Sequence, residues 1–197
     1  MKEKAIQIAR AAEELFLARR YHEVTLDEVA TRAGVGKGTI YRYFQDKEDL
    51  YLRTLLAGFD ELVLSLEDMA SEEENAADLL DLARHHVEFV DRRRPLFALL
   101  RSEELRKAKR ERNLWPKFRK RKESILEVYA SVIERGIDAG LYAPDTDPEL
   151  TASFLMGMLR AGGRLLKGKA KDLAKEAVAV LERGIANRQS DGGMRNV

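Results

Sequence analysis

Polar, basic and aromatic side chains alternate with apolar ones between residues 37 and 44. If this stretch is helical, donors lie on its outward face and two apolar anchors on its inward face, namely Lys37, Thr39, Arg42 and Tyr43 outward with Ile40 and Phe44 inward. Donors gathered on one face of a helix can hydrogen-bond to base edges and phosphates in a major groove about 12 Å wide. The chemistry that this stretch indicates is therefore recognition of double-stranded DNA.

A preceding helix and a glycine turn must hold this face in place. Thr25 is followed three residues later by Glu28, so the hydroxyl can accept from the Glu28 amide while the carboxylate reaches back. This capping box predicts a two-turn helix that ends near Ala33. Gly34 stands where a helix end needs a positive φ. Together with a second two-turn helix over residues 37–44, these signals predict a helix-turn-helix.

Two further helices flank this pair. Apolar residues recur at helical spacing over residues 4–20, which predicts an amphipathic first helix. After residue 44 the chain turns, and Asp46 is expected to be the N-cap of a long helix that starts at Lys47. Thr25 and Lys47, each at a helix N-terminus, are thereby placed where backbone amides and helix dipoles favour phosphates.

The run YHEVTLDEVATRAGVGKGTIYRYFQDKEDLY, residues 21–51, resembles the N-terminal signature of TetR-family transcriptional regulators. The resemblance covers roughly residues 4–53. Its elements include the helix-turn-helix and the start of the long helix: Thr25, Ala30, Ala33, Gly34, Val35, Lys37, Gly38, Thr39, Ile40, Tyr41, Tyr43, Phe44, Lys47 and Leu50. Gly36 departs from the pattern, because the family often has Ser there and Gly lacks the hydroxyl that could contact a phosphate.

The resemblance implies an all-α protein with a three-helix DNA-binding domain over residues 1–46 and a helical regulatory and dimerisation domain over residues 47–197. It also implies which residues meet DNA: Lys37, Gly38 (through its backbone), Thr39 and Tyr41 at the bases, with Thr25, Tyr43 and Lys47 at the phosphates. Arg42 is added as a base-reading residue, because an exposed Arg can pair bidentately with guanine. The alternatives are core packing for Tyr41 and Tyr43 and a solvated surface position for Lys47.

Composition independently favours helices. The 197 residues include 27 Leu, whereas Val, Ile and Thr together number 24, which leaves few residues suited to strands. Further helices are expected over residues 76–93, 96–107 and 114–139, from residue 148, and over residues 172–188. Asn75 and Asp147 are the expected N-caps of two of them, with Pro148 as a first helical residue.

A small-molecule effector is expected to bind among the helices between residues 76 and 168. It would act by moving the helix that begins at Lys47, the one element expected to touch both the phosphate-facing turn and the regulatory domain. The expected polar anchors are His86 and Arg119, and the expected apolar walls are Phe89, Trp115, Phe118 and Tyr129. The alternative for these residues is ordinary core packing, which the sequence does not separate from a cavity.

A homodimer is expected through the last two long helices, because each carries an apolar stripe and two such helices per subunit form a four-helix bundle. The stripes are Leu150, Phe154, Met158, Gly162 and Leu166 on one helix, and Leu173, Val180, Leu181 and Ile185 on the next. Glycine within the first stripe would permit close helix approach.

Charge is segregated along the chain, although the net charge is +1. Residues 54–83 contain nine acids and no Lys or Arg, whereas residues 101–122 contain eleven Lys or Arg against three Glu. Three interpretations stay open, namely solvated surfaces, an anion-attracting pocket mouth and a contact between acidic and basic helices. A basic pocket mouth would suit an anionic or amphipathic effector.

Several classes of function are not expected. The absence of Cys excludes disulfides, thiolate zinc sites and Fe–S clusters, and no metal or cofactor is expected, because the adjacent His85 and His86 lack the i, i+4 spacing of metal ligands. No catalytic triad, phosphate loop or carboxylate pair appears in a suitable context, so enzymatic activity is not expected. The chain shows neither a signal peptide nor an apolar run long enough to span a membrane, which makes the cytoplasm the default location.

These features together predict a ligand-responsive transcriptional regulator, specifically a repressor that binds a palindromic operator as a homodimer. The alternative is a helical ligand carrier or protein-interaction module that does not bind DNA, which would leave the mobility of promoter DNA unchanged.

Overall fold

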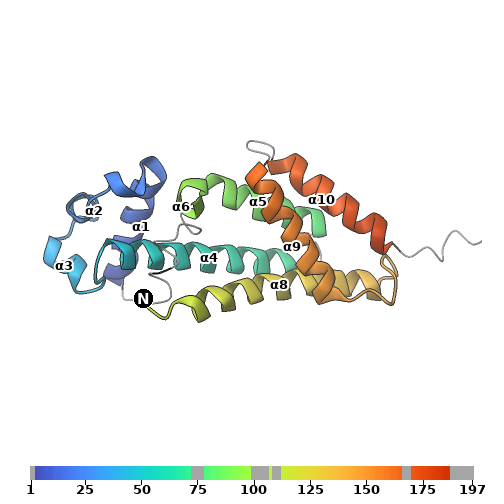
Figure 1. Cartoon of the computed structure of the whole chain (residues 1–197). Helices are drawn as coiled ribbons and strands as arrows, with labels where there is room; N and C mark the ends of the chain where they lie inside the picture. The colour runs from blue at the N-terminus through green and yellow to red at the C-terminus, as the bar shows by residue number, and fades with distance from the viewer. Residues whose placement is uncertain (1–2, 72–77, 99–106, 108–111, 166–169, 187–197) are drawn as a thin grey trace, which may run out of the picture. The chain divides into compact units, whose positions relative to one another are not determined.

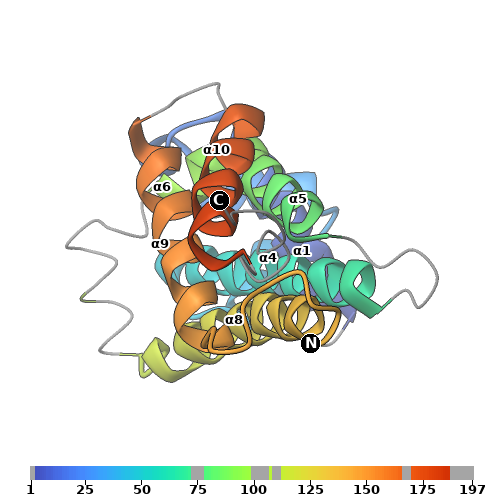
Figure 2. The same ribbon diagram turned by 90° about the vertical axis from the view of Figure 1, so that its right-hand side faces the viewer.

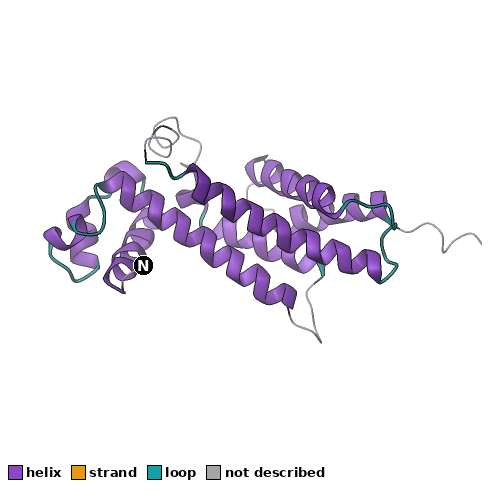
Figure 3. Ribbon diagram, turned by 90° about the horizontal axis from the view of Figure 1, so that it is seen from below, coloured by secondary structure: helices purple, strands orange, loops and turns teal. Residues whose placement is uncertain are grey.

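The computed structural model describes residues 3–71, 78–98, 107, 112–165 and 170–186. Within these ranges the regular elements are helices, and Figure 3 shows them joined by loops without a strand. In order they are α1 (Glu3–Ala18), the short 3-10 helix η1 (Tyr21–Glu23), α2 (Leu26–Arg32), α3 (Lys37–Tyr41), α4 (Lys47–Ser71), α5 (Leu79–Arg92), α6 (Arg94–Ala98), α8 (Trp115–Asp138), α9 (Pro148–Leu165) and α10 (Ala170–Ile185). The predicted all-α fold is confirmed (Figure 1).

The chain forms two compact units. Unit 1 consists of residues 1–61 and 92–121, and unit 2 consists of residues 62–91 and 122–197. The helices α4 and α8 each contribute residues to both units. The boundary predicted between residues 46 and 47 lies inside unit 1, at the start of α4, and stays a prediction about function.

The core of unit 1 joins the N-terminal helices to the segment 92–121. The ring of Tyr51 meets the rings of Phe16 and Tyr21 edge to face, with centroids 4.9 and 5.0 Å apart. The Tyr51 hydroxyl donates a hydrogen bond to the carbonyl oxygen of Leu96, and both residues are fully buried. Each large apolar side chain buried in this way contributes about 1.5–3 kcal/mol to stability. Leu96, Leu114 and Phe118 of this segment are therefore part of the core on which α1 to α3 are built.

In unit 2, α9 and α10 lie side by side (Figure 2). Their close approach depends on Gly162, because a Cβ atom at this position would lie 2.1 Å from Cδ1 of Leu173. The loop before α9 is tied to the end of α10, since the Tyr142 hydroxyl donates to Glu182 at 3.2 Å. The glycine predicted for dimer contact thus packs within its own subunit.

Most predicted helix ends are confirmed. The α9 N-cap is Asp147, whose carboxylate accepts from the Leu150 amide at 2.9 Å. Asn75 lies outside the described residues, and α5 begins later than expected, after Asp78, whose carboxylate accepts from the Asp81 amide at 2.8 Å. Both Asn75 and Asp78 are suitable cap types, so the sequence alone could not choose between them. Of the helix predicted over residues 96–107, most lies outside the described residues.

Candidate nucleic-acid interface

Helix α2 begins with the predicted capping box. Thr25 Oγ1 accepts from the Glu28 amide at 3.2 Å, and Glu28 Oε2 accepts from the Thr25 amide and hydroxyl at 2.8 and 2.9 Å. Hydrogen bonds from Arg19 and Thr25 lower the pKa of Glu28 to about 2. The amide and the hydroxyl of Thr25 both donate to Glu28. For Thr25 to contact a phosphate as predicted, its hydroxyl must turn away from Glu28.

The turn between α2 and α3 is built on Gly34. Its φ is +61°, a region that side chains with a Cβ rarely adopt. The Val35 amide then donates to the Ala30 carbonyl at 3.0 Å, which closes the end of α2. Gly36 is extended, with φ −71° and ψ 149°, and is the N-cap of α3. The predicted helix-turn-helix geometry is therefore present.

Helix α3 is shorter than predicted. It ends at Tyr41, whereas the sequence predicted a helix as far as Phe44. The amides of Tyr43 and Phe44 both donate to the Ile40 carbonyl, at 3.0 and 2.9 Å. These bonds tighten the last turn, as is common where a helix ends. Arg42 and Tyr43 consequently lie in this turn and not in the helix itself.

The predicted base-reading face is turned to solvent. The side chain of Tyr41 is 51% exposed, whereas Ile40 and Phe44 beneath it are 0% and 1% exposed. Tyr43 is partly buried and packs against the core of unit 1. Core packing is thereby excluded as the main role of Tyr41, whereas for Tyr43 it stands beside the predicted phosphate contact. The remaining base-reading positions are exposed or partly exposed, namely Lys37, Gly38, Thr39 and Arg42.

Lys47, at the start of α4, lies against an aromatic ring. Its Nζ atom is 4.3 Å from the centroid of Tyr21, a distance at which a cation and a ring attract each other. Tyr21 is itself buried and packs on Tyr51. The predicted phosphate-contacting ammonium is thus oriented by the core of unit 1.

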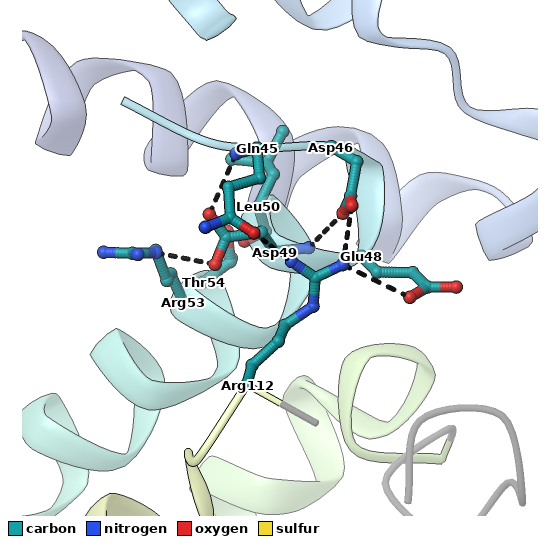
Figure 4. A network of polar contacts seen from close by, with 8 residues as sticks. All are labelled: Gln45, Asp46, Glu48, Asp49, Leu50, Arg53, Thr54 and Arg112. Atoms are coloured by element: carbon teal, nitrogen blue, oxygen red, sulfur yellow. Dashed lines mark hydrogen bonds and ion pairs between the residues drawn. The ribbon is translucent and has the colours of Figure 1, made fainter. Parts of the chain in front are cut away.

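A network of polar side chains closes the turn between α3 and α4 (Figure 4). Asp46 is the predicted N-cap and accepts from the Asp49 amide at 2.8 Å. Asp49 reaches back to accept from the Gln45 amide at 3.0 Å, and also accepts from Arg53 Nε at 2.8 Å. The fifth partner is Arg112, which no sequence pattern singled out. It donates to Gln45 Oε1 at 2.8 Å and to Asp46 Oδ2 at 2.6 Å.

Comparison with known proteins bears on this geometry. Residues 8–54 match the family model for bacterial regulatory proteins of the tetR family. The chain is 33% identical over 162 residues to the uncharacterized HTH-type transcriptional regulator YhgD of Bacillus subtilis, and the match covers 76% of each protein. The chain belongs to the TetR family.

Two further similarities extend over most of the chain of this TetR-family protein. It is 27% identical over 157 residues to the fatty acid metabolism regulator protein of Bacillus subtilis, covering 79% of each. The crystal structure of FadR from Bacillus subtilis in complex with stearoyl-CoA shares its fold, with a TM-score of 0.65, 22% identity and coverage of 91% of this chain and 98% of that one. The protein is accordingly a ligand-responsive, DNA-binding transcriptional regulator.

The six residues predicted to bind the effector of this TetR-family regulator are divided between its two units. Trp115, Phe118 and Arg119 belong to unit 1, where Phe118 is buried in the core and Trp115 is 43% exposed. The other three, His86, Phe89 and Tyr129, belong to unit 2.

Within unit 2, His86 and Tyr129 are brought together. His86 Nδ1 and the Tyr129 hydroxyl are 3.2 Å apart, and burial with the neighbouring His85 lowers the pKa of His86 to about 4. Of the residues predicted to bind the effector, His86 and Tyr129 are thus joined by a direct polar contact, while effector binding itself stays a prediction.

The predicted dimer residues fall into three groups. Leu150, Phe154 and Val180 are 50%, 58% and 56% exposed, and Met158 and Ile185 are partly exposed. Leu173 and Leu181 are only 7% and 8% exposed within the subunit, and Gly162 lies against Leu173. Leu166 lies outside the described residues. The dimer interface stays a prediction that now depends on the exposed members.

Neither a metal site nor a membrane-spanning helix is found in the described part of the chain. No group of three or more His, Asp or Glu side chains there could hold a metal ion. None of the helices in those ranges is long and apolar enough to cross a membrane.

Proposed function

We propose that this TetR-family regulator is a cytoplasmic repressor that binds a palindromic operator as a homodimer. The observation that supports DNA recognition most directly is the exposed surface of α3 and the turn after it, where Lys37, Tyr41 and Arg42 are exposed while Ile40 and Phe44 are buried. A helix of this length reads only a few base pairs, so a two-fold dimer that doubles the site favours a palindrome. Residues 1–46 carry out DNA binding in this proposal, and residues 47–197 dimerisation and regulation.

The proposed effector is an anionic amphipathic molecule such as a long-chain acyl-CoA. The related FadR from Bacillus subtilis was solved in complex with stearoyl-CoA, and residues 101–122 of this chain are rich in Lys and Arg. Within that stretch Arg112 and Arg121 pair with Asp46 and Asp60, so they serve contacts between acidic and basic segments. The proposed partners for the anion are exposed basic side chains at the start of α8, namely Lys117, Arg119, Lys120 and Lys122.

DNA recognition is tested by selecting bound duplexes from a random library and footprinting the consensus. The expected result is a palindrome with half-sites about one helical turn, or a multiple of it, apart. A single short asymmetric site bound by a monomer would contradict the proposed architecture. A protein that shifts no duplex at low salt would instead be a carrier without DNA binding. Repression is tested separately, since loss of the protein should raise transcription from promoters that contain the site.

The effector class is tested on the selected duplex with stearoyl-CoA, stearate and free CoA as separate additions. Coupling of about 1–3 kcal/mol would weaken operator binding by about 5- to 150-fold. Trp115, the one Trp of the chain, reports binding through its fluorescence. A compound that raises the melting temperature but leaves operator affinity unchanged would contradict the proposed coupling.

A further inference from the structure

In the described part of the segment 92–121, Arg93, Arg112 and Arg121 pair with carboxylates of the segment 1–61. Arg93 donates to Glu13 and Glu61, each at 2.8 Å, and Arg121 donates to Asp60 at 2.7 Å. The third is Arg112. The helix starting at Lys47 was expected to be the one element that touches both the phosphate-facing turn and the regulatory domain. Arg112, within residues 47–197 but outside that helix, also contacts the turn, so this expectation is wrong.

Arg112 differs from the other two in what it holds. Arg93 and Arg121 contact α1 and the middle of α4, whereas Arg112 contacts the turn between α3 and α4 (Figure 4). Its guanidinium donates to Gln45 Oε1 and Asp46 Oδ2, and Glu48 Oε2 lies 3.6 Å away. The fork of an Arg can make these bonds at once, which a single ammonium cannot do with the same geometry.

The turn that Arg112 holds immediately precedes Lys47. Residues 46–49 read Asp, Lys, Glu, Asp, so Lys47 is flanked in the sequence by three acidic residues. Partial burial opposes ionisation of Asp46, but hydrogen bonds from the Asp49 amide and from Arg112 outweigh it and lower the pKa of this carboxyl. Pairing with Arg112 offsets the negative charge of Asp46, the residue directly before Lys47, and holds its side chain in place.

We infer that Arg112 is a positioning residue for DNA binding, which holds the turn between α3 and α4 so that Lys47 meets an operator phosphate. The inference rests on the proposed function and deepens it. It places one determinant of DNA affinity on a segment that directly precedes α8, far in sequence from the helix-turn-helix. Arg112 acts through Lys47, so its contribution should exist only while Lys47 is present.

The test is a double-mutant cycle of Arg112→Gln and Lys47→Ala, measured on the duplex selected from a random library and on a random duplex of equal length over a range of salt concentrations. Arg112→Gln alone should weaken binding to both duplexes about tenfold, the size of one charge-assisted contact. It should also flatten the dependence of affinity on salt by about as much as Lys47→Ala does. In the Lys47→Ala background, the same substitution should change affinity by less than about twofold.

Arg121→Gln is a matched control. The Arg121–Asp60 pair resembles the Arg112–Asp46 pair in distance, 2.7 against 2.6 Å, and in Arg exposure, 21% against 20%, but it lies away from the turn. Arg121→Gln should lower the melting temperature without changing the salt dependence. Arg112→Lys replaces Arg112→Gln if the latter does not fold, and it should restore affinity only in part, because an ammonium lacks the fork.

Three outcomes would overturn the inference. Equal losses from Arg112→Gln with and without Lys47 would show that Arg112 contacts DNA itself or acts only on stability. Full restoration by Arg112→Lys would show that charge suffices without positioning. Unchanged DNA binding by Lys47→Ala would show that Lys47 makes no phosphate contact for Arg112 to position. In all three cases wild-type protein still binds the selected duplex, which distinguishes them from failure of the proposed function.

Discussion

Lys37 Nζ lies 2.8 Å from Asp27 Oδ2, so a side chain expected to read bases is held by a carboxylate of the preceding helix. The two side chains are 53% and 64% exposed. The hydrogen bond from Lys37 to Asp27 is the main cause that raises the pKa of Lys37. DNA must therefore compete with Asp27 for this ammonium.

Asp27→Asn should tighten DNA binding, because it releases Lys37 and removes a negative charge near the groove. An exposed ion pair contributes little to stability and is screened by salt, so the expected gain is at most roughly fivefold and should shrink as salt rises. The control is Glu14→Gln, which removes an acid of α1 that is paired with Arg32. Equal gains in both variants, measured by fluorescence anisotropy, would show that only net charge matters.

Arg42 and Lys47 should respond differently to substitution by Ala. Lys47→Ala should weaken binding to all sequences alike and reduce the salt slope by about 0.9 for each phosphate that the protein no longer neutralises. Arg42→Ala should relax the preference at one position of each half-site, by about 1–3 kcal/mol of discrimination. Repeating the library selection with each variant measures both effects. Equal weakening on the selected and random duplexes would show that Arg42 contacts the DNA backbone and not a base.

Phe154→Asp should yield monomers and abolish operator binding, because it places a charge in the apolar face predicted for the dimer. Phe154 is 58% exposed in the subunit, so the substitution should not disturb the subunit core. Leu64→Asp is the control, since Leu64 is 64% exposed on α4 and should leave the dimer intact. Sedimentation measures both, and a dimeric Phe154→Asp protein would place the interface elsewhere.

Gly162→Ala should destabilise unit 2 by about 1–3 kcal/mol, the usual range for an added methyl in a packed interface. The new Cβ atom would lie 2.1 Å from Leu173 Cδ1, so α9 and α10 must separate or Leu173 must move. Gly184→Ala on α10 is the control, because nothing lies within 4 Å of its Cβ position, and Ala should stabilise a helix there slightly. Urea unfolding distinguishes the two, and equal stabilisation would show that the helices adjust freely.

The pair of His86 and Tyr129 should make stability depend on pH. Burial and the neighbouring His85 lower the pKa of His86 from 6.5 to about 4 in the folded chain, so on acidification the unfolded chain takes up the proton first. The contribution of His86 is therefore fully present above pH 6.5, declines as the pH falls, and levels off below about pH 4, with a total loss of at most about 3 kcal/mol.

Urea unfolding at several pH values between 7 and 4 measures this loss. In His86→Gln the decline over this range should be smaller than in the wild type, because the variant lacks the buried imidazole that must take up the proton. An identical pH dependence in the wild type and His86→Gln would contradict the role of His86.

The sequence by itself determined most of the helices and which side chains around α3 are exposed. Thr25 with Glu28, Gly34, and Asp147 act on backbone groups within a few residues of themselves, so each could be recognised without knowledge of the fold. The outward face of α3 was likewise readable, because Ile40 and Phe44 identify the inward side. Where local signals competed, as between Asn75 and Asp78, the sequence was insufficient.

Only the tertiary structure decided which distant side chains meet. Arg112 is separated from Asp46 by 66 residues, and no periodicity links an arginine to a partner so far along the chain. Periodicity also cannot tell whether an apolar stripe faces its own subunit or another copy. Leu173 and Leu181 turned out to be buried within the subunit, while Phe154 and Val180 remain exposed, because the packing of α9 on α10 around Gly162 sets which side of each stripe is covered.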